Sequence, residues 1–186
     1  RSDPVLATTS SGKLLYQSLK ETFLMDTFSS GNGGVTFGPP VPSFGGDKNW
    51  LAVDTSGGLG DGHAYGVWQV FFGCCGNDIL TRSIDAGEAW QAPVDVSLNP
   101  LFGTMDVGPD GTLYVAGIDG SVTQDFGTFV VSRSSNARNP LATPTFAGRR
   151  VDMGGSMELG TGPNPAGLLG QANVFVDASE GPGRGT

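Results

Sequence analysis

The chain has 186 residues, a net charge of -8 and an isoelectric point near 4.4. With only 10 Lys and Arg it has too few cations for a phosphate-binding face, so no nucleic-acid partner is expected. No apolar run approaches the roughly 20 residues that a membrane-spanning helix needs, so no membrane span is expected either. The 31 Gly and 12 Pro favour turns over long helices and predict many short strands.

Segments that read as strand, Gly-containing turn and strand recur along the chain. The first spans residues 5–16, the second runs from residue 51 through a longer loop to residue 72, and the third spans 105–115. A fourth copy starts at Val174 and reaches Thr186 where its second strand would begin. Each pair predicts an antiparallel hairpin. We therefore expect an all-β chain built from small antiparallel sheets.

A polar turn followed by an aromatic residue occurs once in each of the first three copies. The clearest turn reads Ser-x-Asp-x-Gly-x-x-Trp over residues 83–90, and a degenerate version with Asn and Phe spans 30–37. An interrupted version joins residues 134–137 to Thr145 and Phe146. The closing aromatics recur about every 55 residues, a period that suits a four-stranded propeller blade. The motif residues of the two clearer turns are Ser83, Asp85, Gly87, Trp90, Ser30, Asn32, Gly34 and Phe37.

Each motif position has a folding role. A short Ser, Asp or Asn side chain bonds backbone amides and fixes the turn, while Gly supplies a positive φ. The aromatic ring then buries an apolar face against neighbouring strands. We therefore interpret these residues as structural.

These turns and strand pairs resemble the Asp-box, or bacterial neuraminidase repeat, superfamily of sialidase-like β-propellers. The resemblance implies a partial propeller of about three four-stranded antiparallel blades, at residues 1–46, 47–100 and 101–169. A fourth blade would begin over 170–186, and the parent ring would have six blades. In that superfamily the Asp-box turns lie on the rim opposite the ligand face.

Sialidases of this superfamily hold the substrate carboxylate with three arginines and use a tyrosine nucleophile, a glutamate and an aspartate. The family's N-terminal arginine motif is not found here, and no catalytic residue is carried over. Arg82 and Arg133, beside Asp-box turns, are expected to pair with surface carboxylates.

The leading hypothesis is a secreted or cell-surface propeller that binds glycan or another small ligand. The alternatives are a glycoside hydrolase with catalytic residues mainly outside this segment, and a protein-interaction scaffold.

In such a propeller, loops joining the second and third strands share one face with loops joining successive blades, and ligands bind there. We expect a binding site among the polar and aromatic residues of these loops, with Arg149 and Arg150 in the loop that follows the third blade. The candidates are Asp47, Lys48, Trp50, Cys74, Cys75, Asp78, Asp125, Arg149, Arg150 and Asp152.

The adjacent Cys74 and Cys75 allow two interpretations. They form either a vicinal disulfide, a rigid apolar knob at a hairpin tip, or two reduced and partly buried thiols. No cofactor is expected: with His63 as the single histidine, zinc-ligand spacing is absent. Carboxylates and glycines of residues 54–61 leave Ca²⁺ as a weaker alternative, because the EF-hand spacing is missing.

Three blades alone would form an arc with two unburied faces. We expect the remaining blades of a longer chain, or self-association, to close the ring. The start at Arg1 lacks an initiator Met and a signal-peptide core. We interpret this start, together with the end of the sequence at Thr186 within a repeat, as a sign of processing or truncation.

Overall fold

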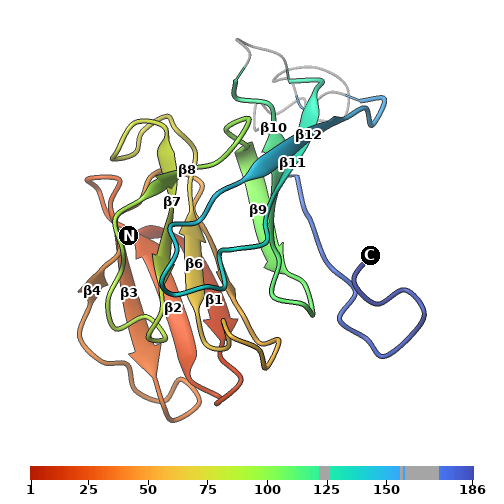
Figure 1. Cartoon of the computed structure of the whole chain (residues 1–186). Coiled ribbons are helices and arrows are strands. Elements are labelled where there is room, and N and C mark those ends of the chain that lie inside the picture. The colour runs from red at the N-terminus through yellow and green to blue at the C-terminus, as the bar shows by residue number, and fades with distance from the viewer. Residues whose placement is uncertain (122–125, 156, 158–171) are drawn as a thin grey trace.

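The fold is all-β and propeller-like (Figure 1). It is given by a computed structural model that describes residues 1–121, 126–155, 157 and 172–186. Within these ranges there is no helix, and so none long and apolar enough to cross a membrane. Twelve strands of the described ranges form three four-stranded antiparallel sheets, which confirms the expected all-β class and sheet size.

Each sheet is a simple meander, because strands that follow one another in sequence also pair in space. The first sheet contains β1 (Ser2–Thr8), β2 (Leu14–Leu19), β3 (Met25–Ser30) and β4 (Val41–Pro42). The second contains β5 (Trp50–Val53), β6 (Ala64–Val67), β7 (Asp78–Ser83) and β8 (Val94–Asp95). The third contains β9 (Leu101–Val107), β10 (Leu113–Ile118), β11 (Phe129–Ser134) and β12 (Ala147–Val151).

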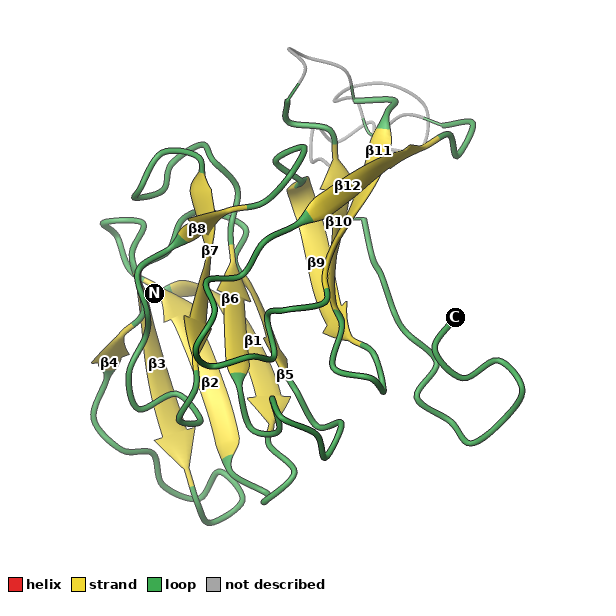
Figure 2. Ribbon diagram, in the orientation of Figure 1, coloured by secondary structure: helices red, strands yellow, loops and turns green. Residues whose placement is uncertain are grey.

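The first strands of the three sheets lie side by side. Strand β5 contacts both β1 and β9, and the sheets fan out from these three strands (Figure 2). The core fills the spaces between neighbouring sheets. Leu15 of the first sheet clusters with Leu51 and Ala64 of the second, with Trp90 packed against them. A larger cluster includes Tyr65 and residues from all three sheets.

The same three hydrogen bonds hold all three Asp-box turns. The Ser Oγ donates to the Asp or Asn Oδ1, the Ser Oγ accepts one turn amide, and the Oδ1 accepts a second. The Oγ to Oδ1 distances are 2.9 Å from Ser30 to Asn32, 2.7 Å from Ser83 to Asp85 and 2.8 Å from Ser134 to Asn136. In the third turn the second amide belongs to Thr145, beyond the insertion, so the two separated pieces of sequence form one turn.

The described C-terminal residues run beside the third sheet. The amides of Val174 and Val176 donate to side chains of β9, Thr104 Oγ1 at 2.9 Å and Asp106 Oδ2 at 2.8 Å. Residues 177–186 then fold back in a turn that repeats the β5–β6 turn. In the β5–β6 turn the Asp54 amide donates to the His63 carbonyl, and the Gly62 amide donates to the Asp54 carbonyl. In the C-terminal turn Asp177, Thr186 and Gly185 make the same two bonds.

Candidate functional site

Three loops meet at the end of the first two sheets opposite the Asp-box turns. They are the β2–β3 turn (20–24), the β4–β5 loop (43–49) and the β6–β7 loop (68–77), together called the loop end (Figure 1, upper left). Backbone bonds join the two longer loops, from Cys74 N to the Gly45 carbonyl at 2.9 Å and from Asp47 N to the Phe72 carbonyl at 3.1 Å. The loop end is therefore one connected structure.

A buried indole supports this crossing. Trp68 is 1% exposed, and Gly46 and Gly73 form a β-bridge directly beside it. A Cβ built on Gly73 would lie 2.9 Å from Trp68 Cδ1, and one on Gly46 would lie closer still. Glycine is required at both positions because the two backbones pass over the indole with no room for a side chain.

The first predicted residues, Asp47 and Lys48, lie in this crossing. Asp47 Oδ2 accepts a hydrogen bond from Gln69 Nε2 at 2.6 Å, and its carbonyl accepts the Gln69 amide at 3.1 Å. Lys48 is exposed and has φ +56°. Asp47 is half-buried, the Gln69 hydrogen bond fixes one of its carboxylate oxygens, and the exposed Lys48 follows it in sequence.

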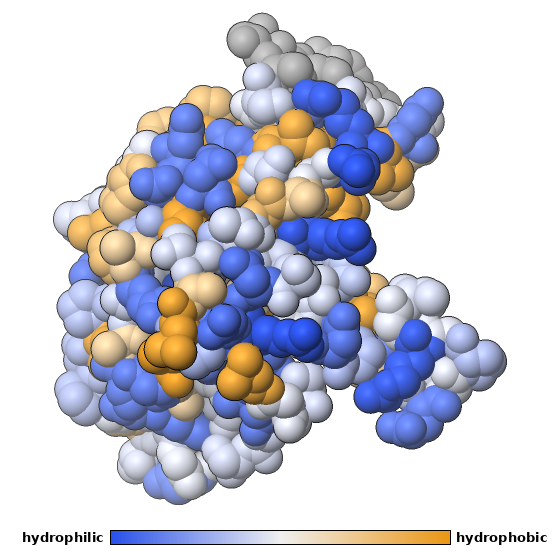
Figure 3. All heavy atoms as spheres, in the orientation of Figure 1, coloured by the Kyte–Doolittle hydropathy of each residue, from blue (hydrophilic) through white to orange (hydrophobic). Residues whose placement is uncertain are grey.

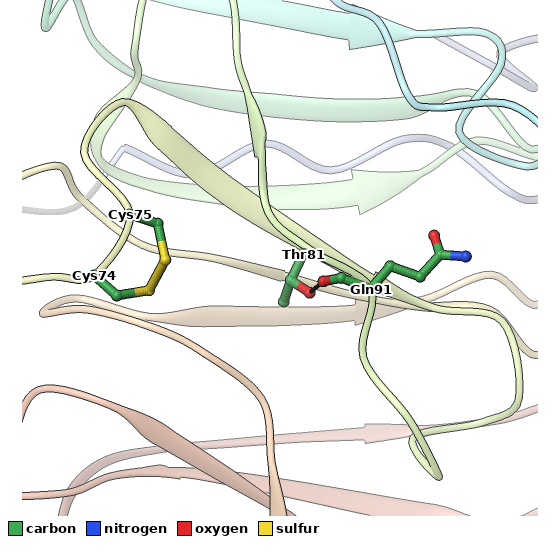
Figure 4. The surroundings of a disulfide bond; sticks show 4 residues. All are labelled: Cys74, Cys75, Thr81 and Gln91. Carbon is green, nitrogen blue, oxygen red and sulfur yellow. Dashed lines mark hydrogen bonds between the residues drawn. A yellow bond between two sulfur atoms is a disulfide. The ribbon is translucent and has the colours of Figure 1, made fainter.

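Cys74 and Cys75 form a vicinal disulfide, the first of the two interpretations left open by the sequence (Figure 4). Cys74 is half-buried and packs against the core, whereas Cys75 is exposed with φ +75°. The Cys75 carbonyl accepts the amide of Asp78, an exposed residue that begins β7. The bridge thus forms a constrained knob on the loop end.

Beside this knob lies a pair of exposed aromatic rings. Phe23 and Phe72 stack with centroids 5.4 Å apart and planes inclined by 28°. They are 38% and 68% exposed, and neighbouring Phe71 is 55% exposed. Both stacked residues have left-handed backbone, at φ +59° and +55°. A bulky residue in that region costs about 1–2 kcal/mol, which glycine would avoid.

The rings of Phe23 and Phe72 are therefore kept at strained positions where they add little to the core. Strained residues of this kind concentrate at functional sites. The sequence-based candidates did not include these phenylalanines, because a positive φ at a non-glycine residue leaves no local pattern. The available signal was the Phe71-Phe72 pair directly before the Gly-Cys-Cys-Gly segment.

The remaining candidates lie apart from the ring pair or outside the described residues. Trp50 is half-buried in β5, packs against the core and lines a cavity of about 180 Å³ together with Lys48. Asp152 is exposed and accepts the amide of Gly154 at 2.9 Å. Asp125 lies outside the described residues.

Arg149 and Arg150 were expected in a loop, and this was wrong: both belong to β12, the last strand of the third sheet. Because residues are inserted in the third Asp-box turn, the fourth strand of this sheet begins only after Phe146, at Ala147, and so includes both arginines. Arg150 Nε donates to Asp119 Oδ2 at 2.6 Å. Burial alone would raise the pKa of the Asp119 carboxyl, but hydrogen bonds from Ser121 and Arg150 outweigh it and lower that pKa.

The expectation that Arg82 and Arg133 pair with surface carboxylates was also wrong. Arg82 is only 3% exposed, and its guanidinium donates to three backbone carbonyls of the third sheet's Asp-box turn. Arg133 is exposed and makes no ion pair within the described ranges. The sequence places both arginines next to an Asp-box turn, but it does not show which groups of the neighbouring sheet lie within hydrogen-bonding distance of them.

Arg82 belongs to a buried polar cluster between the second and third sheets, with Asp54, His63 and Tyr65. Burial and the Arg82 charge lower the pKa of His63, and burial raises the pKa of Tyr65 well above its usual range. In the described residues no group of three or more His, Cys, Asp or Glu side chains is placed to hold a metal ion. Asp61, in the segment considered for Ca²⁺, accepts from Ser10 Oγ at 2.7 Å.

No protein-family model matches the chain, and no curated protein matches it significantly.

Proposed function

We propose that the chain is part of a sialidase-like Asp-box propeller whose loop end binds a glycan without catalysing a reaction. The observation that carries this proposal is the exposed, stacked pair Phe23 and Phe72, held at strained backbone positions beside the vicinal disulfide. Three hydrogen-bonded Asp-box turns in a propeller-like fold support the family assignment. The disulfide supports a secreted or cell-surface location, since such bonds persist in oxidising compartments.

The chemistry of the loop end fits a sugar. A pyranose has an apolar face of C–H groups that packs on an aromatic ring, and hydroxyls at its edge that need polar partners. Asp47, whose amide bonds the Phe72 carbonyl, retains a second carboxylate oxygen, and Lys48 and Asp78 are exposed in or beside the loops of the same end. These groups offer acceptors and a donor around an aromatic platform.

The loop end is also rigid before any ligand arrives. The Gly46–Gly73 bridge, the Gln69–Asp47 bond and the disulfide restrain the two longer loops. A preorganised surface loses little conformational entropy on binding, so even a small contact area gives measurable affinity.

Within this chain the strongest resemblance to sialidase chemistry is the buried pair of Tyr65 and Arg82, and it is unsuited to catalysis. Tyr65 is fully buried and its raised pKa disfavours the phenolate nucleophile. Arg82 already donates to Gln91 and to three carbonyls, so its fork is not free to hold a substrate carboxylate. The pair therefore gives no support for catalysis, and the proposal remains binding at the loop end.

The test is a panel of immobilised neutral and sialylated oligosaccharides, followed by calorimetric titration with those that bind. Phe72→Ala and Phe23→Ala should each lower affinity at least about tenfold, the equivalent of 1.4 kcal/mol. Phe175→Ala is the matched control, because Phe175 is 79% exposed and lies beside the third sheet. Failure to bind any sugar of the panel, or binding that Phe72→Ala leaves unchanged, contradicts the proposal.

A fluorogenic sialoside separates binding from hydrolysis. The purified chain should release no fluorophore above the uncatalysed background. Turnover that persists through purification and is lost in a Tyr65→Phe variant of unchanged thermal stability would show instead that the chain is an enzyme.

A further inference from the structure

A cavity of about 180 Å³ lies between the first two sheets, where β1 and β5 begin. Its walls are residues 3–5 of β1 and residues 48–50 around the start of β5, and the two strands contact each other. We call it the β1–β5 cavity. Liquid water occupies about 30 Å³ per molecule, so the cavity has room for about six waters. Pockets that hold drug-sized ligands measure roughly 300–1,000 Å³, so an organic occupant of this cavity has to be smaller.

The outer surface is mixed in character. On the face drawn in Figure 3, the described residues form small hydrophobic groups among hydrophilic ones. Singly exposed apolar residues are normal on a protein, and a protein partner would need a larger continuous patch. A cavity lined by unpaired polar groups is therefore the better guide to a further ligand.

A β-bulge places Asp3 at the β1–β5 cavity. Ser2 and Val5 are three positions apart in β1, whereas the β2 residues opposite them are only two positions apart. Strand β1 therefore carries one extra residue here, and the half-buried Asp3 within the bulge has left-handed backbone at φ +47°. Bulges re-aim side chains and are frequent next to functional sites.

The other wall carries a cation that is also unpaired. Lys48 is exposed, with φ +56°. Among the described residues, neither Lys48 nor Asp3 forms an ion pair, with each other or with a neighbour. The charges nearest to them in sequence have other partners, because Arg1 donates to Asp26 and Asp47 accepts from a side-chain amide. The cavity thus presents one charge of each sign.

The residue after Lys48 adds a buried amide. Asn49 is 3% exposed, and in the described part of the chain neither its Nδ2 donor nor its Oδ1 acceptor has a hydrogen-bond partner. Buried polar groups without a partner are costly and rare unless water or a ligand completes them. The half-buried Trp50 and Val5 supply an apolar surface to the same cavity. A cation, an anion, an unsatisfied amide and an apolar wall therefore surround one small space.

We propose that the β1–β5 cavity binds a small zwitterion, a free α-amino acid with an apolar side chain. The ligand carboxylate pairs with the Lys48 ammonium, and the ligand ammonium pairs with the Asp3 carboxylate. Asn49 donates to the ligand carboxylate through Nδ2 or accepts from its ammonium through Oδ1. The apolar side chain of the ligand packs against Trp50 and Val5.

The two charges decide between this ligand and the alternatives. A neutral sugar can bond each polar group of the cavity, but it leaves both charges without a counter-charge. A simple anion is attracted by Lys48 and repelled by Asp3, and a simple cation meets the reverse. A zwitterion is attracted by both. The inference uses neither Phe23 nor Phe72, so it does not depend on glycan binding.

Calorimetric titration of the chain with leucine tests the proposal, with valine, methionine and phenylalanine as further apolar amino acids. Leucine should bind with a Kd between about 1 µM and 1 mM. Two analogues of similar shape each lack one charge: leucinamide has no carboxylate, and 4-methylpentanoate has no ammonium. Each should bind at least about tenfold more weakly than leucine. The proposal is overturned if none of the amino acids binds at about 10 mM, or if the analogues bind as tightly as leucine.

Variants of the two charges locate the site. Asp3→Asn and Lys48→Met each remove one charge from a side chain that is half-buried or exposed, so the fold should tolerate them. Each should weaken leucine binding at least about tenfold. Asp95→Asn is the matched control, because Asp95 is exposed in β8, at the opposite edge of the second sheet from β5. Leucine binding that both variants leave unchanged overturns the proposal. Binding of a neutral sugar that they weaken, in place of leucine, would assign the cavity to a glycan instead.

Tryptophan fluorescence gives an independent readout. Trp50 lines the cavity, whereas Trp68 is buried beneath the loop crossing and Trp90 packs against a core cluster. Leucine should change the emission of the unmodified chain. Trp50→Phe should lose most of that change while it still binds leucine in the calorimeter. A change that persists in full in Trp50→Phe would place the amino acid elsewhere and overturn the proposed site.

Discussion

Arg82 of the second sheet donates a 2.7 Å hydrogen bond to the backbone carbonyl of Ala137, 55 residues further along the chain in the third sheet. A buried guanidinium is tolerated only when its donors are paired. Here the partners are carbonyls exposed by the sharp Asp-box turn, together with the Gln91 side chain at 2.8 Å. The turn that stabilises one sheet thereby also provides the acceptors that attach it to the preceding sheet.

Replacing Arg82 with Ala should strongly destabilise the protein. The change leaves three carbonyls without their donor and opens a cavity between two sheets, so we expect a loss of about 3–5 kcal/mol in the free energy of unfolding. Urea denaturation followed by fluorescence measures it. Arg133→Ala removes the same side chain from the equivalent exposed position and should change the monomer's stability by less than about 0.5 kcal/mol. Equal losses of stability in the two variants would contradict the conclusion that Arg82 attaches the third sheet to the second.

The Asp-box serines should contribute measurably to stability. Ser83→Ala removes the acceptor for the Gly87 amide at 2.8 Å and the donor to Asp85 at 2.7 Å, and leaves a buried amide unpaired. Loss of such a turn or cap costs about 1–2 kcal/mol. Ser135→Ala is the control, because Ser135 is exposed beside the third turn. A stability for Ser83→Ala equal to that of the unmodified chain would show that the turn does not need this bond network.

Much of the fold could be predicted because its signals are local. Strand pairs, turn glycines and the Ser, Asx and aromatic positions of the repeat are all read within a dozen residues. The interrupted third turn was traced across its insertion because Asn136 and Thr145 kept their types. By contrast, the partners of Arg82 and the strand position of Arg149 depend on how the insertion folds against neighbouring strands.

The candidate site was located only in part for the same reason. The Gly-Cys-Cys-Gly segment drew attention to the right loop, and Asp47 and Lys48 lie in the loop that crosses it. Phe23 and Phe72 are 49 residues apart in sequence, and they come together only because the first two sheets place these loops at one end. The left-handed backbone of Phe23 belongs to the β2–β3 turn, which the Phe23 amide closes on the Lys20 carbonyl, whereas that of Phe72 lies in the loop crossing. A phenylalanine at either position gives no sequence signal of that backbone.

Stability should fall as the solution is acidified from pH 7 to pH 5, because of His63. Burial and the Arg82 charge lower the pKa of this imidazole in the folded state, so below about pH 6.5 the unfolded chain binds a proton that the folded chain resists. The free energy of unfolding therefore decreases with decreasing pH, by at most about 1.4 kcal/mol per pH unit.

His63→Gln should remove this slope. The carboxyls with shifted pKa values, including Asp26 and Asp119, have their pKa lowered, so their contribution is lost only at still more acidic pH. The window from pH 7 to pH 5 therefore isolates the histidine. Urea denaturation at several pH values gives the result, and a slope that survives in His63→Gln would assign it to another group.

Gly46→Ala should disrupt the loop end. The added Cβ would overlap Trp68 Cδ1 and the backbone of Gly73, and neither can move without breaking the crossing. We expect about 2 kcal/mol or more of destabilisation, with altered tryptophan fluorescence. Gly31→Ala is the control, because a Cβ there meets nothing within 4 Å and its φ is not positive. If the two variants have the same stability and the same tryptophan fluorescence, the loops do not pass over Trp68 as described.

The vicinal disulfide should be intact in native, unreduced protein and should support ligand binding. Alkylation without reductant should add no label, and alkylation after reduction should add two. Because the bridge constrains the loop that carries Phe72, reduction should weaken binding to whichever oligosaccharide the panel identifies. The double variant Cys74→Ser with Cys75→Ser should reproduce that loss without responding to reductant. Two thiols that react freely in unreduced protein would exclude the bridge, and the rigid knob on the loop end would then have to be abandoned.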